Sequence, residues 1–201
     1  QARFQLITTG KIRQNQLLFE DQHLERLTKA SRYFAYPFNP EDLRQRIEEE
    51  CRACDSHQDY RLRISISKSG ELELSRQVLT PLSQSFCQAK LCLQEADLQQ
   101  AFTYFKTTHR PHLSIGEQEK IYHNKSGELL ETSIGNLVLK IAGKFYTPPI
   151  SLGILPGIYR QHLLEIGQAE EKVLTLKELA QAEAVYGCNA VRGLYELTLE
   201  S

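Results

Sequence analysis

Apolar and polar residues alternate in short runs through the first third of the chain, and a helical pattern lies between two of these runs. Residues 3–20 form two predicted strands around a polar connection, and residues 21–34 repeat apolar side chains at the spacing of a helix. Residues 61–67 alternate strictly, and a Lys-Ser-Gly turn leads back into residues 71–75, so we expect a β-hairpin. This part of the chain is therefore predicted to mix helices with antiparallel strands.

The second half carries strand patterns of the same kind, separated by loops and two further helices. A polar stretch at 94–100 follows a strand and is the expected domain junction. A loop rich in Gly and Pro leads into a predicted helix at 158–166, and Thr175 with Glu178 forms a capping box that opens another helix. We expect an α/β protein of the α+β type, with two mixed domains at 1–95 and 96–201 and mainly antiparallel sheets. The strands expected in the second domain lie at 120–124, 137–143 and 144–149 and within 184–199.

The composition narrows the kind of partner. Hydrophobic residues make up 41% of the 201 residues and charged residues 24%, which is typical of a globular protein with an apolar core. The formal net charge of −1 gives no overall attraction to nucleic acid or to an anionic membrane, so an anion site must be built from a few placed groups. No stretch approaches the roughly 18 apolar residues of a membrane span, and the first residues lack the pattern of a signal peptide. We expect a cytoplasmic protein that binds a small molecule, without nucleic acid or membrane partners.

Five cysteines, an odd number without regular spacing, indicate reduced thiols rather than a disulfide framework. Cys51 and Cys54 form a CxxC pair, which is also found in redox and zinc sites. Both lie on the apolar stripe of a predicted helix that starts near Asn39 or Glu41, and no second CxxC or HxxxH pair completes a zinc site. We expect buried structural cysteines and no bound metal.

The loop-to-helix junction at 152–165 is the clearest local signal for a ligand. Gly157 allows a tight turn, and the first free N–H groups of the following helix, at Ile158 and Tyr159, point outward with the positive end of the helix dipole. Such a helix start can bind a phosphate or another anion. The same Pro-Gly sequence can also do no more than begin a helix, so a ligand site needs further groups.

Four other positions are candidates for those groups. Arg26 flanks the apolar face of its helix, where it either reaches inward or is an ordinary solvated arginine. Glu131, followed by small residues, either holds a carboxylate in a cleft or simply ends a strand. Residues 189–193 offer a second backbone turn. Lys106 follows two aromatic residues, and on its own it is most simply a surface lysine with its stem on apolar side chains.

Five segments, taken in order along the chain, match the motifs of one family. They are HLERL at 23–27, KTTHR at 106–110, GELLETSIGNLVL at 127–139, LGILPGIYR at 152–160 and CNAVRG at 188–193. Together they resemble the class IV aminotransferase-like enzymes that use pyridoxal 5'-phosphate and share fold type IV. That family includes branched-chain and D-amino acid aminotransferases and 4-amino-4-deoxychorismate lyase. The opening FQLITT and the KTTHR form of the lysine motif are most similar to the lyase, particularly to lyase domains fused to a chorismate-aminating synthase.

The resemblance implies a role for each matched residue. Lys106 matches the lysine that forms a Schiff base with the cofactor, Glu131 the carboxylate facing the ring nitrogen, and Arg26 the arginine on the phosphate. An acid at the ring nitrogen keeps the ring electron-withdrawing, and the lysine can also move protons. The other implied contacts are Gly157, Ile158, Tyr159, Asn189, Ala190 and Val191 for the cofactor, Arg110, Arg192 and Thr8 for the substrate, and Thr9 for catalysis, with Arg160 either a further substrate cation or a solvated helix residue.

The resemblance implies a lyase that eliminates pyruvate from aminodeoxychorismate and releases 4-aminobenzoate for folate synthesis. Two alternatives stay open, an aminotransferase on the same scaffold and a non-catalytic relic of the fold. Family members are usually homodimers, so we expect a dimer. Two departures affect the site: the interval from Lys106 to Glu131 is shorter than usual, and Ala190 stands where many relatives carry Ser or Thr, which removes one hydroxyl from the phosphate contacts.

Overall fold

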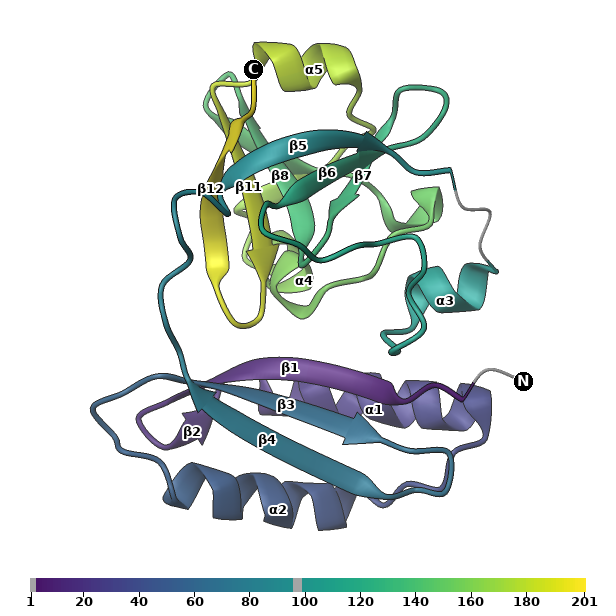
Figure 1. The fold of residues 1–201 in the computed structure, drawn as a ribbon, viewed down its shortest axis with the longest axis vertical. Coiled ribbons are helices and arrows are strands. Elements are labelled where there is room, and N and C mark those ends of the chain that lie inside the picture. The colour runs from purple at the N-terminus through teal and green to yellow at the C-terminus, as the bar shows by residue number, and fades with distance from the viewer. Residues whose placement is uncertain (1–2, 96–98) are drawn as a thin grey trace. The chain divides into compact units, whose positions relative to one another are not determined.

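The computed structural model describes residues 3–95 and 99–201, and the chain divides into two compact units (Figure 1). Unit 1 consists of Gln1–Pro81 with Phe105–His109, and unit 2 of Leu82–Tyr104 with Arg110–Ser201. The junction predicted at 94–100 includes residues 96–98, which lie outside the described residues. Each unit has its own hydrophobic core.

Unit 1 is a four-stranded antiparallel sheet in the order β2-β1-β3-β4. Helices α1 and α2 contact each other as well as the sheet, so they lie on the same face of it. The two strands and the helix predicted in the first 34 residues, the second helix and the hairpin are all confirmed. The elements are β1 (Leu6–Arg13), β2 (Gln16–Leu17), α1 (Glu20–Phe34), α2 (Pro40–Arg52), β3 (Tyr60–Ile66) and β4 (Leu72–Val78).

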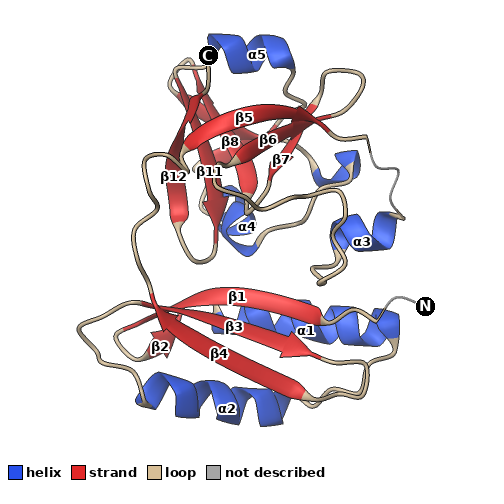
Figure 2. Ribbon diagram, viewed as in Figure 1, coloured by secondary structure: helices blue, strands red, loops and turns tan. Residues whose placement is uncertain are grey.

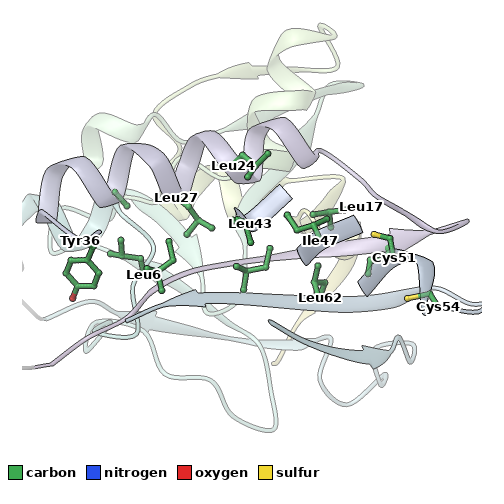
Figure 3. Close-up of a cluster of buried hydrophobic side chains, with 14 residues drawn as sticks. Leu6, Leu17, Leu24, Leu27, Tyr36, Leu43, Ile47, Cys51, Cys54 and Leu62 are labelled. Carbon is green, nitrogen blue, oxygen red and sulfur yellow. The ribbon is translucent and has the colours of Figure 1, made fainter. Parts of the chain in front are cut away.

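The core of unit 1 lies between the sheet and its two helices (Figure 3). Leu27 of α1 and Leu43 of α2 are fully buried, as are Leu6 and Leu62 of the sheet. Helix α2 begins as its sequence predicts, because the Asn39 side chain accepts a hydrogen bond from the Glu41 amide at 3.0 Å.

Both cysteines of the CxxC pair are part of this core. Cys51 and Cys54 are buried and free, and burial raises the pKa of the Cys51 thiol to about 11. A thiol with so high a pKa is a poor nucleophile and a poor metal ligand. The predicted burial of both cysteines in the core is therefore confirmed.

A short segment far along the chain completes unit 1. The amide of Ile7 donates to the carbonyl of Lys106 at 3.0 Å, and the amide of Thr108 donates to the carbonyl of Gln5 at 2.9 Å. Leu6 and Thr107 form an antiparallel bridge between these two bonds. Residues 105–109 therefore lie along the start of β1, and this pairing fixes the backbone position of Lys106.

Unit 2 is built around one mostly antiparallel sheet in the order β10-β9-β8-β11-β12-β5-β6-β7. Figure 2 labels β5, β6, β7, β8, β11 and β12 of this sheet. Strand β7 also pairs with β8, so six of the strands form a closed barrel. The predicted strands and helices of the second half are confirmed, whereas α3, β7 and β10 were not predicted. The elements are β5 (Gln88–Leu93), α3 (Gln100–Tyr104), β6 (Lys120–His123), β7 (Leu129–Thr132), β8 (Asn136–Ile141), β9 (Lys144–Thr147), η1 (Ile150–Leu152), α4 (Ile158–Glu165), β10 (Ala169–Glu171), α5 (Leu176–Gln181), β11 (Ala184–Asn189) and β12 (Gly193–Leu199).

Leucines of several strands fill the interior of unit 2. Leu129, Leu137 and Leu139 are fully buried in one cluster with Leu197. The predicted capping box at the start of α5 is also confirmed, since the Glu178 carboxylate accepts from the Thr175 amide at 2.7 Å. Within the described ranges, no helix is both long and apolar enough to cross a bilayer.

Candidate active site

Glu131, in β7, is a buried carboxylate with an acceptor to spare. Its Oε1 accepts from the Leu155 amide at 3.3 Å and lies 3.7 Å from Nη2 of Arg110, while Oε2 is 3.9 Å from Nε2 of His112. Burial raises the pKa of Glu131 to about 7, although Arg110 and the Leu155 bond act in the opposite direction. In the described part of the chain Oε2 has no hydrogen-bond partner. This oxygen therefore keeps its full capacity to accept a hydrogen bond.

The helix start predicted as an anion site is preceded by a closely packed turn. Gly157 is the N-cap of α4 and offers no side-chain cap to the first turn, where Ile158 and Tyr159 follow. The Asn136 side chain donates to the Leu155 carbonyl at 2.8 Å, and a Cβ on Gly157 would collide with Oδ1 of Asn136. This close approach requires glycine at position 157. Because glycine has no side chain, the positive end of the helix dipole is not capped by a side-chain oxygen of the N-cap residue.

The turn after β11 is organised by Asn189. Its Oδ1 accepts from the amides of Val191 at 3.0 Å and Arg192 at 2.8 Å, and its Nδ2 donates to the Ile134 carbonyl at 3.0 Å. The amide of Val191 is thus taken up by Asn189 in this structure. Gly193, which ends the turn, lies against the ring of Tyr159, so the turn neighbours the first turn of α4. The two segments predicted to bind the phosphate are therefore adjacent.

Arg160 lies in α4 and is a structural residue. Its side chain is buried, and Nη2 donates to the Pro148 carbonyl at 2.9 Å and forms an ion pair with Glu171 at 3.0 Å. Neither of its two expected roles survives, because the guanidinium is not solvated and its charge is already matched by a carboxylate. Arg160 instead connects α4 to β10 and to the loop that follows β9.

In unit 1 a chain of hydrogen bonds runs from Arg26 to a buried histidine. Arg26 Nη1 lies 3.4 Å from the Thr8 hydroxyl, which is 2.6 Å from Nδ1 of His23. Arginine can only donate, so the Thr8 oxygen accepts from Arg26, while the tautomer of His23 sets the direction of the bond between Thr8 and His23. Burial, followed by the charges of Arg26 and Lys106, lowers the pKa of His23 to about 3. His23 is therefore neutral, and Nδ1 is the ring nitrogen bonded to Thr8.

This arrangement changes the picture of the two threonines on β1. Thr8 is fully buried and its hydroxyl is engaged by two side chains of α1, so it offers a substrate no free group. Thr9 lies on the opposite face of the strand, because successive side chains alternate, and it is 9% exposed. Lys106 is half-buried and is close enough to His23 to lower its pKa.

Each unit thus gathers a set of predicted residues. Unit 1 brings together Lys106, Arg26 and Thr8. Unit 2 brings together Glu131 and Arg110, and it also places the first turn of α4 next to the turn after β11. No group of three or more His, Cys, Asp or Glu in the described ranges could hold a metal ion. The N-cap and first turn of α4 contain Gly157, Ile158 and Tyr159, and the turn after β11 contains Asn189, Ala190, Val191 and the half-buried Arg192.

Three functional neighbours were missed from the sequence. His23 precedes Arg26 by three residues on the same helix, which is a usable signal for a shared face. Asn136 ends the GELLETSIGN segment and pairs with Glu131 across the turn at 132–135, which is a local relationship, whereas nothing local connects His112 to Glu131. The contact of His112 with Glu131 and that of Asn136 with Leu155 depend on segments that meet only in the folded chain.

Comparison with known proteins decides the family. The model of the amino-transferase class IV family matches residues 5–198, nearly the whole chain. The chain belongs to this family. Its fold is accordingly that of the fold type IV enzymes, which agrees with the expectation drawn from the five segments.

Similar proteins carry more than one activity in their names. Aminodeoxychorismate lyase of Saccharomyces cerevisiae is 30% identical over 127 residues, which are 50% of this chain and 34% of the yeast protein. A candidate amino-acid aminotransferase of Mesorhizobium loti has a structure with a TM-score of 0.84, 25% identity and coverage of 98% of this chain and 100% of its own. A candidate 4-amino-4-deoxychorismate lyase of Haemophilus somnus 129pt has a TM-score of 0.77, 23% identity and coverage of 96% and 100%. The chain thus spans about a third of the yeast lyase but all of the two solved structures.

Proposed function

We propose that this chain is a pyridoxal phosphate enzyme, with Glu131 as the partner of the cofactor's ring nitrogen. The observation that carries the proposal is the buried Oε2 of Glu131, which has no hydrogen-bond partner among the described residues and fits a protonated ring nitrogen. Membership of the class IV family supports the same cofactor. When bound, the cofactor would link to the substrate amine and withdraw electrons from the carbon that bears it.

The other proposed contacts follow from the chemistry of each group. Lys106 would bind the cofactor's aldehyde, and Arg26 would neutralise the phosphate from a position set by Thr8. The uncapped start of α4 after Gly157 would donate backbone N–H groups to the same phosphate, and the turn after β11 lies beside this helix start. Cations, a helix start and a carboxylate match the phosphate and the ring nitrogen of this cofactor in charge.

We propose 4-amino-4-deoxychorismate lyase as the activity. The similarity to the yeast enzyme and the KTTHR segment support it. Lys106, released from the cofactor by the substrate amine, would remove the proton from the ring carbon bearing that amine. The bond from the ring to the enolpyruvyl oxygen then breaks, pyruvate leaves, and the ring becomes 4-aminobenzoate without any second substrate. Arg110 and Arg192 are the cations proposed for the substrate's carboxylates.

An amino-acid aminotransferase is the second candidate. It is favoured by the Mesorhizobium loti neighbour, which this chain covers in full at 25% identity. Such an enzyme would need an amino donor and a 2-oxo acid acceptor, and Lys106 would move a proton between two carbons instead of supporting an elimination. The two reactions therefore differ in their need for a second substrate.

The decisive experiment supplies each substrate in turn to protein loaded with pyridoxal phosphate. Aminodeoxychorismate alone is expected to give 4-aminobenzoate and pyruvate in equal amounts, and Lys106→Ala is expected to give neither. Transfer of an amino group from an amino acid to a 2-oxo acid, without either product, would replace the lyase by the aminotransferase. Protein that takes up no cofactor would leave the non-catalytic relic.

We further propose a homodimer, as the family resemblance implies. Size-exclusion chromatography with light scattering at micromolar concentration should give twice the mass of the chain. A monomer under those conditions would contradict this proposal without bearing on the cofactor.

A further inference from the structure

Glu119 is a buried carboxylate that the proposed chemistry does not use. It is fully buried just before β6, and both of its oxygens are engaged. Oε1 accepts from the amides of Lys120 and Ser133, each at 3.0 Å, and also from the Ser133 hydroxyl. Oε2 accepts from the hydroxyl of Tyr195 at 2.8 Å. A buried acceptor that satisfies four donors is costly to remove.

Space for this arrangement is left by two glycines. A Cβ on Gly135 would lie 2.9 Å from the hydroxyl of Tyr195, and a Cβ on Gly187 would run into its ring. Burial, together with the nearby Glu119, raises the pKa of Tyr195, so its hydroxyl keeps the proton that it donates. The phenol is thereby locked between the carboxylate and the turn at 132–135.

That turn connects three parts of the candidate site. It directly follows Glu131 and precedes Asn136, whose side chain holds the carbonyl of Leu155 ahead of α4. The carbonyl of Ile134, within the turn, accepts from Asn189, which organises the turn after β11. Every proposed cofactor contact of unit 2 is therefore bonded to, or continuous with, the segment that Glu119 supports.

We infer that Glu119 is a positioning residue, which holds the turn at 132–135 through Ser133 and Tyr195 and thereby sets the three cofactor contacts of unit 2. The inference rests on the proposed function for its effect on the cofactor. Independently of the cofactor, Glu119 holds the turn because it accepts hydrogen bonds, and not because of its volume or its charge. The hydrogen bonds of Glu119 go to Lys120, Ser133 and Tyr195 and not to Glu131, so its effect on Glu131 passes through the turn.

Two substitutions separate these roles. Glu119→Leu keeps most of the volume but leaves four buried donors without an acceptor, whereas Glu119→Gln keeps an oxygen for Ser133 and presents an amide to the Tyr195 oxygen. Pyridoxal phosphate affinity, followed by the cofactor's absorbance, is expected to fall about tenfold or more in the Leu variant and to stay within about threefold in the Gln variant. Glu178→Leu, which removes the capping carboxylate of α5 in the same unit, is the matched control and should bind like wild type.

The outcomes are distinct. A Leu variant that binds as well as wild type would reduce Glu119 to packing, and a Gln variant as weak as the Leu variant would make its charge the cause; either result overturns the inference. If Glu119→Leu does not fold, Tyr195→Phe removes a single donor and should still weaken binding about threefold or more. Affinity of Tyr195→Phe equal to wild type would also overturn it.

Hydrogen exchange of the cofactor-free protein gives a second readout that does not depend on the proposed function. In Glu119→Leu, amides of residues 131–136 and 189–192 should exchange at least about tenfold faster, while those of α1 in unit 1 should not change. Wild-type protein that binds no cofactor would end the proposed function, yet exchange would still decide whether Glu119 holds the turn. Unchanged exchange in these two segments would refute that role.

Discussion

Arg110, which is four residues after Lys106 in the sequence, lies 3.7 Å from the buried carboxylate of Glu131. Burial raises the pKa of Glu131, and Arg110 acts against that rise. Burial also lowers the pKa of Arg110 itself, with Glu131 opposing that shift. Each group thus helps to keep the other charged in an environment that disfavours both charges. A carboxylate that faces a ring nitrogen must be ionised to be useful, so this pair bears directly on the proposed cofactor.

Arg110→Met is expected to raise the pKa of Glu131 above its present value of about 7, because the nearby positive charge is lost. Binding of pyridoxal phosphate should then require a higher pH than in wild type. Titrating cofactor affinity between about pH 6 and pH 9 checks this shift. Arg110→Lys keeps a cation and should restore part of the wild-type profile. Superimposable profiles for Arg110→Met and wild type would show that Arg110 has no influence on the carboxylate.

Glu131 should make the cofactor-free protein less stable as the pH rises. The ordinary pKa of 4.5 applies in the unfolded chain and about 7 in the folded one, so between these values the folded chain holds a proton that the unfolded chain has released. The stabilisation due to Glu131 is complete below about pH 4.5 and is lost as the pH rises through about 7. Relative to Glu131→Gln, wild type should lose on the order of 1–3 kcal/mol of unfolding free energy between pH 5 and pH 8. Urea unfolding at the two pH values measures this, with Glu128→Gln as control.

His23 should give the opposite pH dependence. Its pKa falls from 6.5 in the unfolded chain to about 3 in the folded one, so below pH 6.5 the unfolded state binds more protons. Its contribution is complete above about pH 6.5 and is lost as the pH falls toward 3. The variant His23→Asn keeps a hydrogen-bonding group for Thr8 but does not titrate. The amount by which its unfolding free energy is below that of wild type should therefore become smaller as the pH falls. The exposed His57→Asn is the matched control, and a constant deficit for His23→Asn would argue against a neutral, buried imidazole.

Gly157→Ala should destabilise the turn before α4, because the added Cβ collides with Oδ1 of Asn136. We expect a loss of about 1–3 kcal/mol in unfolding free energy, as in other overpacked sites, together with weaker binding of inorganic phosphate. Asn136→Ala in the same chain removes the collision and should recover part of the stability, which a double-mutant cycle measures. Gly116→Ala, where a Cβ meets no atom within 4 Å, should be neutral. A stable Gly157→Ala variant would mean that the turn can move.

Local patterns predicted most elements of the fold because a helix or strand with one buried face repeats its apolar residues at a fixed spacing. Helix α1 was predictable from Leu24 and Leu27 at helical spacing, and the hairpin β3–β4 from strict alternation around a short turn. Strand β7 was missed because all four of its residues are buried, which removes the alternation on which the prediction depends. Family resemblance, rather than periodicity, identified Glu131 within that strand.

The contacts within the site could not be predicted in the same way. Arg160 looked like an exposed helix residue or a substrate cation, but Pro148 and Glu171 of other segments bury and pair it. Thr8 looked available to a substrate, yet α1 folds His23 and Arg26 onto its hydroxyl. Each correction comes from a partner at least 11 residues away, whose position depends on tertiary packing rather than on spacing along the chain.

Unit 1 is discontinuous in the sequence, because residues 105–109 pair with the start of β1 while the chain on either side belongs to unit 2. No single cut therefore releases a complete N-terminal half. A fragment that ends at Pro81 would contain Arg26 and His23 but would leave the edge of β1 at Gln5 and Ile7 without its partner strand. Dissecting this protein into independently folding pieces requires either grafting the lysine segment onto the first piece or joining the original ends and opening the chain elsewhere. Lys106 thus belongs to unit 1 by its backbone pairing, although the chain on both sides of its segment belongs to unit 2.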